Sequence, residues 1–224
     1  MNPRIRRRLQ VLLDRMEQVE RDAAEIRSGD PLAARFASFG RNSRISAPRV
    51  ALMNAASVAI GDDVYVRSYS CIEALASPGT AVLRIGNRVQ IGHHCRFVAL
   101  NGIVVEDDVG VGHHVSISDS VHDWKQPSAA PGWQTPLVVG RPLRIGAGAT
   151  LGNNNVLVGG ITIGARSITA PNCFLNRDVP PDTVVAGNPA RVVRRRLPSG
   201  EWEWAVDPAS MDIETRGAIE GPPA

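Results

Sequence analysis

Bulky aromatic side chains are scarce in this sequence. Four Trp, four Phe and two Tyr make up only 4% of its 224 residues, although hydrophobic residues make up 43%. A core built around rings is therefore excluded, and small and β-branched aliphatic residues must fill the interior. Such residues favour thin β structures. A chain of 24.0 kDa is long enough to bury one main core with terminal additions.

Cysteine and lysine are also rare. Cys71, Cys95 and Cys173 are odd in number and have neither zinc-binding nor redox spacing, which argues against a disulfide framework and predicts a cytoplasmic protein. Lys125 is the only lysine, and arginines cluster near both ends, at residues 4–8 and 191–196. No nucleic-acid-binding motif accompanies them, so they predict solvated ends and a site for a phosphorylated ligand.

Long apolar runs are absent as well. No segment approaches the roughly 20 apolar residues of a membrane span, and the basic N-terminus lacks the continuous apolar stretch of a signal peptide. Hydrophobic residues spaced alternately by four and three predict a helix from about Pro3 to Ser28. This helix is expected either to form a coiled-coil stalk or, as we favour, to pack on a neighbouring surface.

From about residue 45 the chain repeats every six residues. Ile60-Gly-Asp-Asp-Val64 and Val111-Gly-His-His-Val115 share an aliphatic first residue, a glycine and a small or β-branched fifth residue. This period fits neither a helix nor a strand–helix unit. It predicts a parallel β-solenoid in which three hexapeptides make one triangular coil. Aliphatic first residues should point inward, and Cys95 and Cys173, at fifth positions, should lie in the core.

The end of the repeats resembles a known family. Asp178-Val-Pro-Pro-Asp-Thr-Val-Val-Ala-Gly-Asn-Pro-Ala-Arg-Val192 is similar to the segment that closes the β-helix of hexapeptide-repeat acyltransferases, in the group of xenobiotic, galactoside and capsule or colanic acid O-acetyltransferases. The resemblance implies a mainly β, left-handed parallel β-helix. We expect an N-terminal helix and connector (1–44), the β-helix domain (45–192) and a C-terminal extension (193–224).

The repeat is interrupted once, between residues 119 and 142. This stretch is rich in Pro, Gly and Trp and predicts a loop extruded from a coil corner. His122 lies at its root, and Ser118-Asp119-Ser120-Val121-His122 resembles the D-x-x-H motif of the polysaccharide O-acetyltransferase branch. Transfer of an acyl group from a thioester to a hydroxyl needs a base, and neutral imidazole suits that role. We therefore expect His122 to be the general base.

Other loop residues are candidates for supporting roles. Asp119 and Asp123 are close enough in sequence to His122 either to orient the ring or to bind acceptor hydroxyls, and the sequence does not choose between them. Asp119 is the expected second catalytic residue and Asp123 an expected acceptor contact. Trp124 and Trp133 suit the faces of sugars, and they suit anchoring of the loop equally well.

The resemblance also implies a donor and an assembly. Relatives use acyl-CoA, bound in a groove between two subunits of a homotrimer, and no metal. Arg177 and Arg191 match basic positions of the family motifs and are expected at the phosphates. Asn153 and Gly160 are expected along the pantetheine arm. Two departures leave donor binding open: Thr150 stands where the family often has Trp, and Pro171, which has no N–H, lies where a backbone amide is expected.

Two other classes of protein remain as alternatives. The pairs His93-His94 and His113-His114 are compatible with a zinc site like that of gamma-class carbonic anhydrases, but the H-x-x-x-x-H spacing of that class is absent. A non-catalytic β-helix scaffold is the other alternative. The expected function is a cytoplasmic O-acyltransferase, acting with acetyl-CoA or another acyl-CoA on a sugar hydroxyl of a polysaccharide, glycolipid or glycosylated metabolite.

Overall fold

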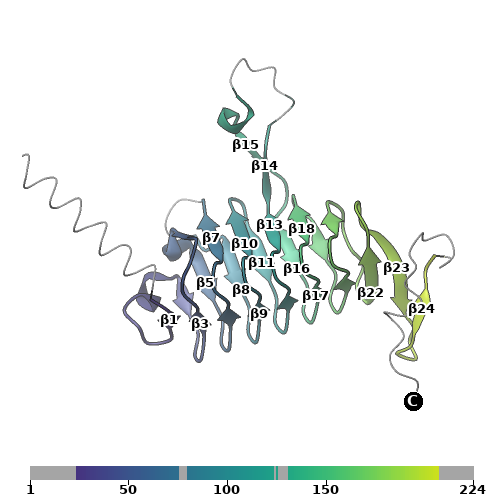
Figure 1. Ribbon diagram of the computed structural model, residues 1–224, viewed down its shortest axis with the longest axis horizontal. Helices are drawn as coiled ribbons and strands as arrows, with labels where there is room; N and C mark the ends of the chain where they lie inside the picture. The colour runs from purple at the N-terminus through teal and green to yellow at the C-terminus, as the bar shows by residue number, and fades with distance from the viewer. Residues whose placement is uncertain (1–23, 76–79, 124, 126–130, 207–224) are drawn as a thin grey trace, which may run out of the picture.

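The chain is built around a solenoid of three parallel sheets. The computed structural model describes residues 24–75, 80–123, 125 and 131–206, so most of the predicted N-terminal helix lies outside the described residues. Six coils stack along one axis, and each coil contributes one strand to each sheet (Figure 1). The mainly β, parallel solenoid predicted from the six-residue period is confirmed.

Two of the sheets, B and C, contain six strands each, one from every coil. Sheet B consists of β2 (Ser38–Phe39), β5 (Val58–Ile60), β8 (Leu83–Ile85), β11 (Ile103–Val105), β16 (Leu143–Ile145) and β19 (Thr162–Ile163). Sheet C consists of β4 (Ala51–Met53), β7 (Cys71–Ala74), β10 (Arg96–Ala99), β13 (Ser116–Ser118), β18 (Val156–Val158) and β21 (Phe174–Leu175). Along the chain each coil passes through sheet B, then sheet A, then sheet C.

Sheet A is longer because further strands extend it at both ends. Its strands from the six coils are β3 (Arg44–Ile45), β6 (Tyr65–Val66), β9 (Gln90–Ile91), β12 (Gly110–Val111), β17 (Thr150–Leu151) and β20 (Ile168–Thr169). β22 (Thr183–Ala186) follows β20 in parallel, beyond the sixth coil. β1 (Ile26–Arg27) joins one end, and β23 (Arg191–Arg196) and β24 (Trp202–Trp204) join the other, all antiparallel. The other described elements are a separate two-stranded sheet and three short 3-10 helices: η1 (Ala33–Arg35), η2 (Ala55–Ser57) and η3 (Gly132–Gln134).

The prediction that the N-terminal helix extends to Ser28 is wrong. Ile26 and Arg27 form β1, which pairs with β3, and the backbone N–H of Ser28 donates to the carbonyl of Ser43. The first coil would otherwise leave a sheet edge with unpaired backbone groups. Ile26 is only 1% exposed in this position. Pairing with the sheet edge and burial of Ile26 therefore outweigh the heptad pattern, in which Ile26 is the last position.

The core is a stack of aliphatic side chains in register. Inward residues of sheet B stack as Ile60, Ile85, Val105, Ile145 and Ile163, one per coil, and all are at most 3% exposed. The fifth positions of the repeats are filled by small or β-branched residues that are also buried, among them Val64, Val89, Cys95, Ala149 and Cys173. The inward orientation predicted for the repeat positions is thus confirmed.

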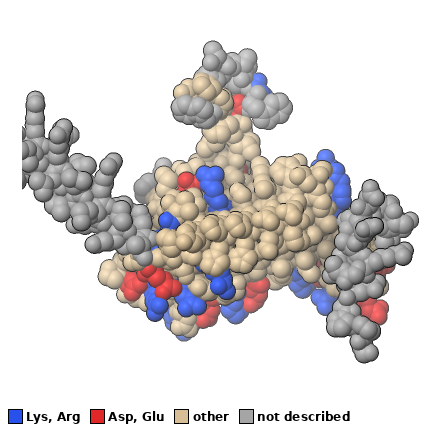
Figure 2. Space-filling view, in the orientation of Figure 1, with Lys and Arg blue, Asp and Glu red and all other residues tan. Residues whose placement is uncertain are grey.

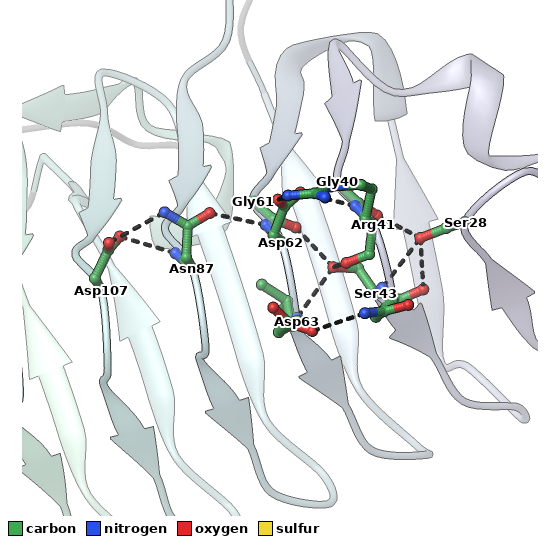
Figure 3. A network of polar contacts seen from close by, with 11 residues as sticks. Ser28, Gly40, Arg41, Ser43, Gly61, Asp62, Asp63, Asn87 and Asp107 are labelled. Atoms are coloured by element: carbon green, nitrogen blue, oxygen red, sulfur yellow. Dashed lines mark hydrogen bonds and ion pairs between the residues drawn. The ribbon is translucent and has the colours of Figure 1, made fainter.

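The corners between sheets B and A are closed by side chains from the next coil. The backbone N–H of Arg41 donates to Oδ1 of Asp62 at 2.8 Å, that of Asp62 to Oδ1 of Asn87 at 2.9 Å, and that of Asn87 to Oδ1 of Asp107 at 2.8 Å (Figure 3). A backbone N–H at a corner cannot join the strand ladder, and these caps satisfy it. The N–H of Asn87 also lowers the pKa of the Asp107 carboxyl, because it stabilises the carboxylate.

The caps explain why glycine recurs at the second position of the repeat. A Cβ on Gly61 would lie 2.6 Å from the carbonyl oxygen of Gly86 and 2.7 Å from the capping Oδ1 of Asn87. The acceptor that closes the corner thus occupies the space that a side chain needs. Gly110, on the outer face of β12, is different, because its nearest neighbours are Thr150 atoms 4.0 Å away.

Arginines reinforce the same corners from outside. Arg41 pairs with Asp62 at 2.8 Å, and Arg88 pairs with Asp108 at 2.6 Å, each linking one coil to the next. Charged side chains gather along the lower edge of the solenoid in Figure 2, and a broad band across the middle carries few of them. Within the described residues, no helix combines the length and apolar character needed to cross a membrane.

The corner geometry predicts how two glycines respond to the same substitution. Gly61→Ala should destabilise the fold by about 1–3 kcal/mol, the usual cost of overpacking, because backbone and cap must both move. Gly110→Ala, in the same kind of repeat, should be neutral or slightly stabilising because its Cβ meets only ordinary contacts. Urea unfolding followed by circular dichroism measures both; equal midpoints for the two variants would contradict the crowding argument.

Candidate functional site

The loop at residues 119–142 leaves the solenoid between the fourth and fifth coils. Its two arms form an antiparallel ribbon of β14 (Ser120–His122) and β15 (Leu137–Val139), in which Ser120 pairs with Val139 and His122 with Leu137. The ribbon stands away from the solenoid axis (Figure 1). His122 is therefore carried on a strand pair and faces solvent in the single chain.

The orientation of the His122 ring is set by a backbone carbonyl. Nδ1 of His122 lies 2.9 Å from the carbonyl oxygen of Thr135, across the ribbon. A carbonyl oxygen only accepts hydrogen bonds, so Nδ1 carries the proton in this contact. The neutral ring then presents an unprotonated Nε2 on its other side, which is the form that a general base requires.

Asp119 lies at the start of the loop, and its carboxylate is occupied by backbone groups. It is 0% exposed and accepts hydrogen bonds from the backbone N–H groups of Leu100, Asn101 and Gly102, the corner before β11. Within the described residues the Asp119 carboxylate accepts only from backbone N–H groups, and the His122 ring contacts Thr135. The geometry gives Asp119 an anchoring position, and a catalytic role for it stays a prediction.

The expected acceptor residues are only partly described. Asp123 is half-buried, its backbone N–H donates to the carbonyl of Pro136 at 2.9 Å, and its Oδ1 accepts from the backbone of Lys125 at 3.1 Å. Asp123 thus continues the ribbon by one more backbone contact beyond His122. Trp124 lies outside the described residues, as does the side chain of Trp133, whose backbone belongs to η3.

Two of the four expected donor residues meet at one cavity. Arg177 and Arg191 line a cavity of about 160 Å³ near the C-terminal end of the solenoid, together with Phe174, Asn176 and Ala190. Both arginines are exposed, and Arg191 donates to the neighbouring carbonyl of Ala190. This volume is below the 300–1,000 Å³ typical of a whole ligand pocket. It suits one part of a large ligand, such as a phosphate.

The other two expected donor residues lie elsewhere. Oδ1 of Asn153 accepts the backbone N–H of His113 at 2.8 Å, and the carbonyl of Asn153 accepts from Asn172, so this residue caps a corner between sheets A and C. Gly160 lies against Arg141, where a Cβ would be 2.8 Å from the arginine Cγ. Neither of them lines the cavity at Arg177 and Arg191.

The paired histidines form stacks along the solenoid. The rings of Tyr69, His94 and His114 stack with centroids 4.8 and 4.7 Å apart, and those of His93 and His113 are 5.4 Å apart. Nδ1 of His113 accepts the backbone N–H of His93 at 3.0 Å, so it serves as a corner cap. Among the described residues, no group of three or more His, Cys, Asp or Glu is placed to hold a metal ion.

The cysteines are buried and poorly suited to nucleophilic chemistry. Burial raises the pKa of the Cys95 thiol to about 11, and it also raises those of Cys71 and Cys173. All three are free thiols. A raised pKa suppresses the reactive thiolate at neutral pH. Within the described part of the chain, the histidine on the ribbon is therefore the better candidate for catalysis.

Sequence comparison finds relatives, some of which are named acetyltransferases. Over 110 residues the chain is 30% identical to nodulation protein L of Rhizobium meliloti, covering 49% of this chain and 58% of that protein. It is 33% identical over 111 residues to serine acetyltransferase 2 of Arabidopsis thaliana, covering 50% of this chain and 30% of that protein. The chain thus spans only part of the length of these relatives. No protein-family model matches it.

Solved structures share the fold. A variant of AntD, an N-acyltransferase from Bacillus cereus in complex with dTDP and coenzyme A, superposes with a TM-score of 0.66 at 14% identity, over 79% of this chain and 93% of that one. A hexapeptide-repeat-containing acetyltransferase from Vibrio cholerae, complexed with acetyl-CoA, has a TM-score of 0.51 at 27% identity and covers 72% of both chains. The predicted resemblance to the hexapeptide-repeat acyltransferases and their left-handed β-helix is confirmed.

The buried thiols give a direct test of the site assignment. At pH 8 a thiol with a pKa of about 11 is only about one-thousandth thiolate, so Cys95 should react with Ellman's reagent very slowly in the folded protein. Cys71 and Cys173 should also be protected, and all three should react within minutes in guanidinium chloride. One thiol that reacts rapidly before unfolding would point instead to a cysteine nucleophile.

Proposed function

Because this chain is related in sequence and in fold to the hexapeptide-repeat acyltransferases, we propose that it is an acyl-CoA-dependent acyltransferase with His122 as general base. The observation that carries the proposal is the 2.9 Å contact between Nδ1 of His122 and the carbonyl of Thr135. That contact leaves Nε2 free to accept a proton, on a ribbon that stands beside the solenoid.

The reaction follows from this tautomer. Nε2 of His122 removes the proton from an acceptor hydroxyl while its oxygen attacks the thioester carbonyl carbon of the donor. The tetrahedral intermediate collapses with cleavage of the carbon–sulfur bond, and the imidazolium returns its proton to the leaving thiolate. The products are an ester and free coenzyme A. Acetyl-CoA is the proposed donor, and the reaction uses no metal.

We propose a sugar hydroxyl, in a polysaccharide, glycolipid or glycosylated metabolite, as the acceptor. The D-x-x-H pattern at residues 119–122 supports this class. Asp123, one residue beyond the base and half-buried, is the proposed contact for a neighbouring hydroxyl. The B. cereus neighbour acts on nitrogen according to its name. An amino sugar is therefore the control acceptor. If the protein acylates the amino sugar faster than a sugar hydroxyl, the physiological product is an amide and not an ester.

The donor is proposed to bind with its phosphates at Arg177 and Arg191. These guanidinium groups lie at one cavity, near the C-terminal end of the solenoid. Arginine suits phosphate because its planar donors match two oxygens at once. The acyl end of coenzyme A then extends along the solenoid toward the ribbon, with Asn153 and Gly160 as proposed neighbours of the pantetheine arm.

A second copy of the chain is proposed to complete the site, within a homotrimer. In the single chain, Val121, Leu137, Val138 and Val139 on the ribbon are between 38% and 45% exposed. The stem of the ribbon is drawn almost entirely as uncharged surface in Figure 2. An isolated two-stranded ribbon is only marginally stable in water, so these side chains need a covering surface.

The proposed location is the cytoplasm, which suits three unpaired thiols.

Removal of the proposed base should abolish turnover. His122→Ala is expected to lower kcat by about 100-fold or more, the usual effect of losing a general base. His114→Ala, which removes an exposed histidine of the ring stack, should keep kcat within about 2-fold. Comparison of the two variants therefore distinguishes loss of the general base from loss of an exposed histidine elsewhere. Thiol release from acetyl-CoA with a panel of sugars measures both, and an unimpaired His122→Ala enzyme would exclude His122 as the base.

Mixing of inactive subunits tests the shared site. Co-expressed His122→Ala chains and Arg177→Ala/Arg191→Ala chains, purified through two different tags, should recover up to about a third of the wild-type activity, because each mixed trimer keeps one of its three sites intact. Sedimentation should give about three times 24.0 kDa. The same double variant alone should bind coenzyme A more weakly. Mixed oligomers without activity, or a fully active monomer, would rule out a site between subunits.

A further inference from the structure

One corner of the solenoid, residues 100–102 between β10 and β11, contacts both arms of the loop that carries His122. This corner receives the outgoing arm of the loop through Asp119, whose buried carboxylate accepts the backbone N–H of Leu100 at 2.9 Å and that of Asn101 at 2.8 Å. At the same corner the chain re-enters the solenoid, because the carbonyl of Gly102 accepts the backbone N–H of Leu143, the first residue of β16, at 2.9 Å. Both ends of the insertion thus converge on three residues.

Asn101 joins the two arms directly. Its backbone N–H donates to Asp119 on the outgoing side, and its side-chain Nδ2 donates to the carbonyl of Gly140 on the returning side at 2.7 Å. Gly140 directly follows Val139, the last residue of β15, which pairs with Ser120. The side chain of Asn101 therefore closes the base of the ribbon, one residue below its first rung.

We infer that Asn101 is a positioning residue for His122, acting through the base of the ribbon and not by contact with the reacting atoms. The inference rests on the proposed function for its catalytic consequence. Its structural part, that Asn101 holds the two arms together, is independent of any activity.

The length of the ribbon makes the base of the loop important. His122 lies three residues beyond Asp119, so its ring is roughly 10 Å from the attachment at a strand rise of about 3.3 Å per residue. A tilt of about 6° at the base then moves the ring by about 1 Å, and a displacement of this size can cost on the order of 100-fold in rate. A contact that fixes the tilt therefore matters more than its distance from the chemistry suggests.

Other corner asparagines provide a comparison. Asn87 also bridges two coils, with its backbone N–H donating to Asp107 and its Oδ1 accepting from Asp62. It contacts no part of the loop in these bonds. Asn101 differs in that its side chain contacts the returning arm of the insertion. Substitution of either side chain leaves the backbone N–H in place, so Asn101→Ala removes the bond to Gly140 and preserves the bond to Asp119.

The experiment compares Asn101→Ala, Asn101→Gln and Asn87→Ala in the full-length protein, with acetyl-CoA and the best sugar of the screened panel. Asn101→Ala should lower kcat by about 10- to 100-fold with the KM for acetyl-CoA within about 2-fold, because the base is displaced while the donor site is intact. Asn101→Gln keeps an amide donor and should recover part of kcat. Asn87→Ala should leave kcat within about 2-fold.

Hydrogen exchange of the ribbon amides supplies the readout that needs no activity. Asn101→Ala should accelerate exchange at residues 120–122 and 137–139 by about 10-fold or more, while the amides of the coils exchange as in the wild type. Unchanged exchange there would overturn the clamp itself. If His122→Ala is inactive but Asn101→Ala keeps full kcat, the positioning role is wrong and the proposed function stands. If His122→Ala is fully active, the proposed base fails, and exchange alone decides whether Asn101 holds the ribbon.

Discussion

The hydrogen bond from a corner N–H to a side chain of the next coil is the interaction on which this structure depends. Short strands pair well along the solenoid, but each turn between them directs backbone groups out of the ladder, and an unsatisfied buried N–H is costly. Asp62, Asn87 and Asp107 satisfy these groups one coil at a time. The same geometry fixes which positions can carry a side chain, because the cap occupies the space beside glycines such as Gly61. Repetition of this corner lets a chain with so few aromatic residues form an ordered core.

The proposed active site is a local variation on that corner. Asp119 caps a corner as the other acidic residues do, but it accepts three backbone N–H groups and is completely buried. From this anchored residue the chain leaves the solenoid, forms a ribbon and brings His122 against the carbonyl of Thr135. Regular structure thus supplies rigidity, and the irregular insertion supplies the chemical group. The exposed apolar ribbon and the cavity at Arg177 and Arg191 lie at different places on one chain, which fits a site assembled from neighbouring copies.

The sequence predicted the repeating part of the fold well, because a six-residue period imposes one inward orientation on the aliphatic first residues of the repeats, such as Ile60, Ile85 and Ile163. It located the loop and His122 for the same reason, since an interruption is visible only against a regular background. It failed at Ile26, where pairing with an open sheet edge overrides a helical pattern. The antiparallel strand β24 was also beyond prediction, because its arginine partners stack on Trp204 and Trp202 only once β23 and β24 are paired. The sequence could not indicate the partner of His122, because that partner is a backbone carbonyl and every residue has one.

The antiparallel strands at the two ends of sheet A affect how copies of this chain meet. A parallel solenoid has the same hydrogen-bonding pattern on its first and last coils, so two molecules with bare ends would fit head to tail and grow into a filament. β1 runs antiparallel to β3, so it reverses the direction of the outermost strand at one end of the sheet. At the other end β23 and β24 reverse the direction in turn, so β24 again runs with the coil strands. A second solenoid that approaches β1 therefore meets a strand of the wrong polarity. The reversal disfavours fibre growth along the axis and leaves the flanks as the surfaces through which chains associate.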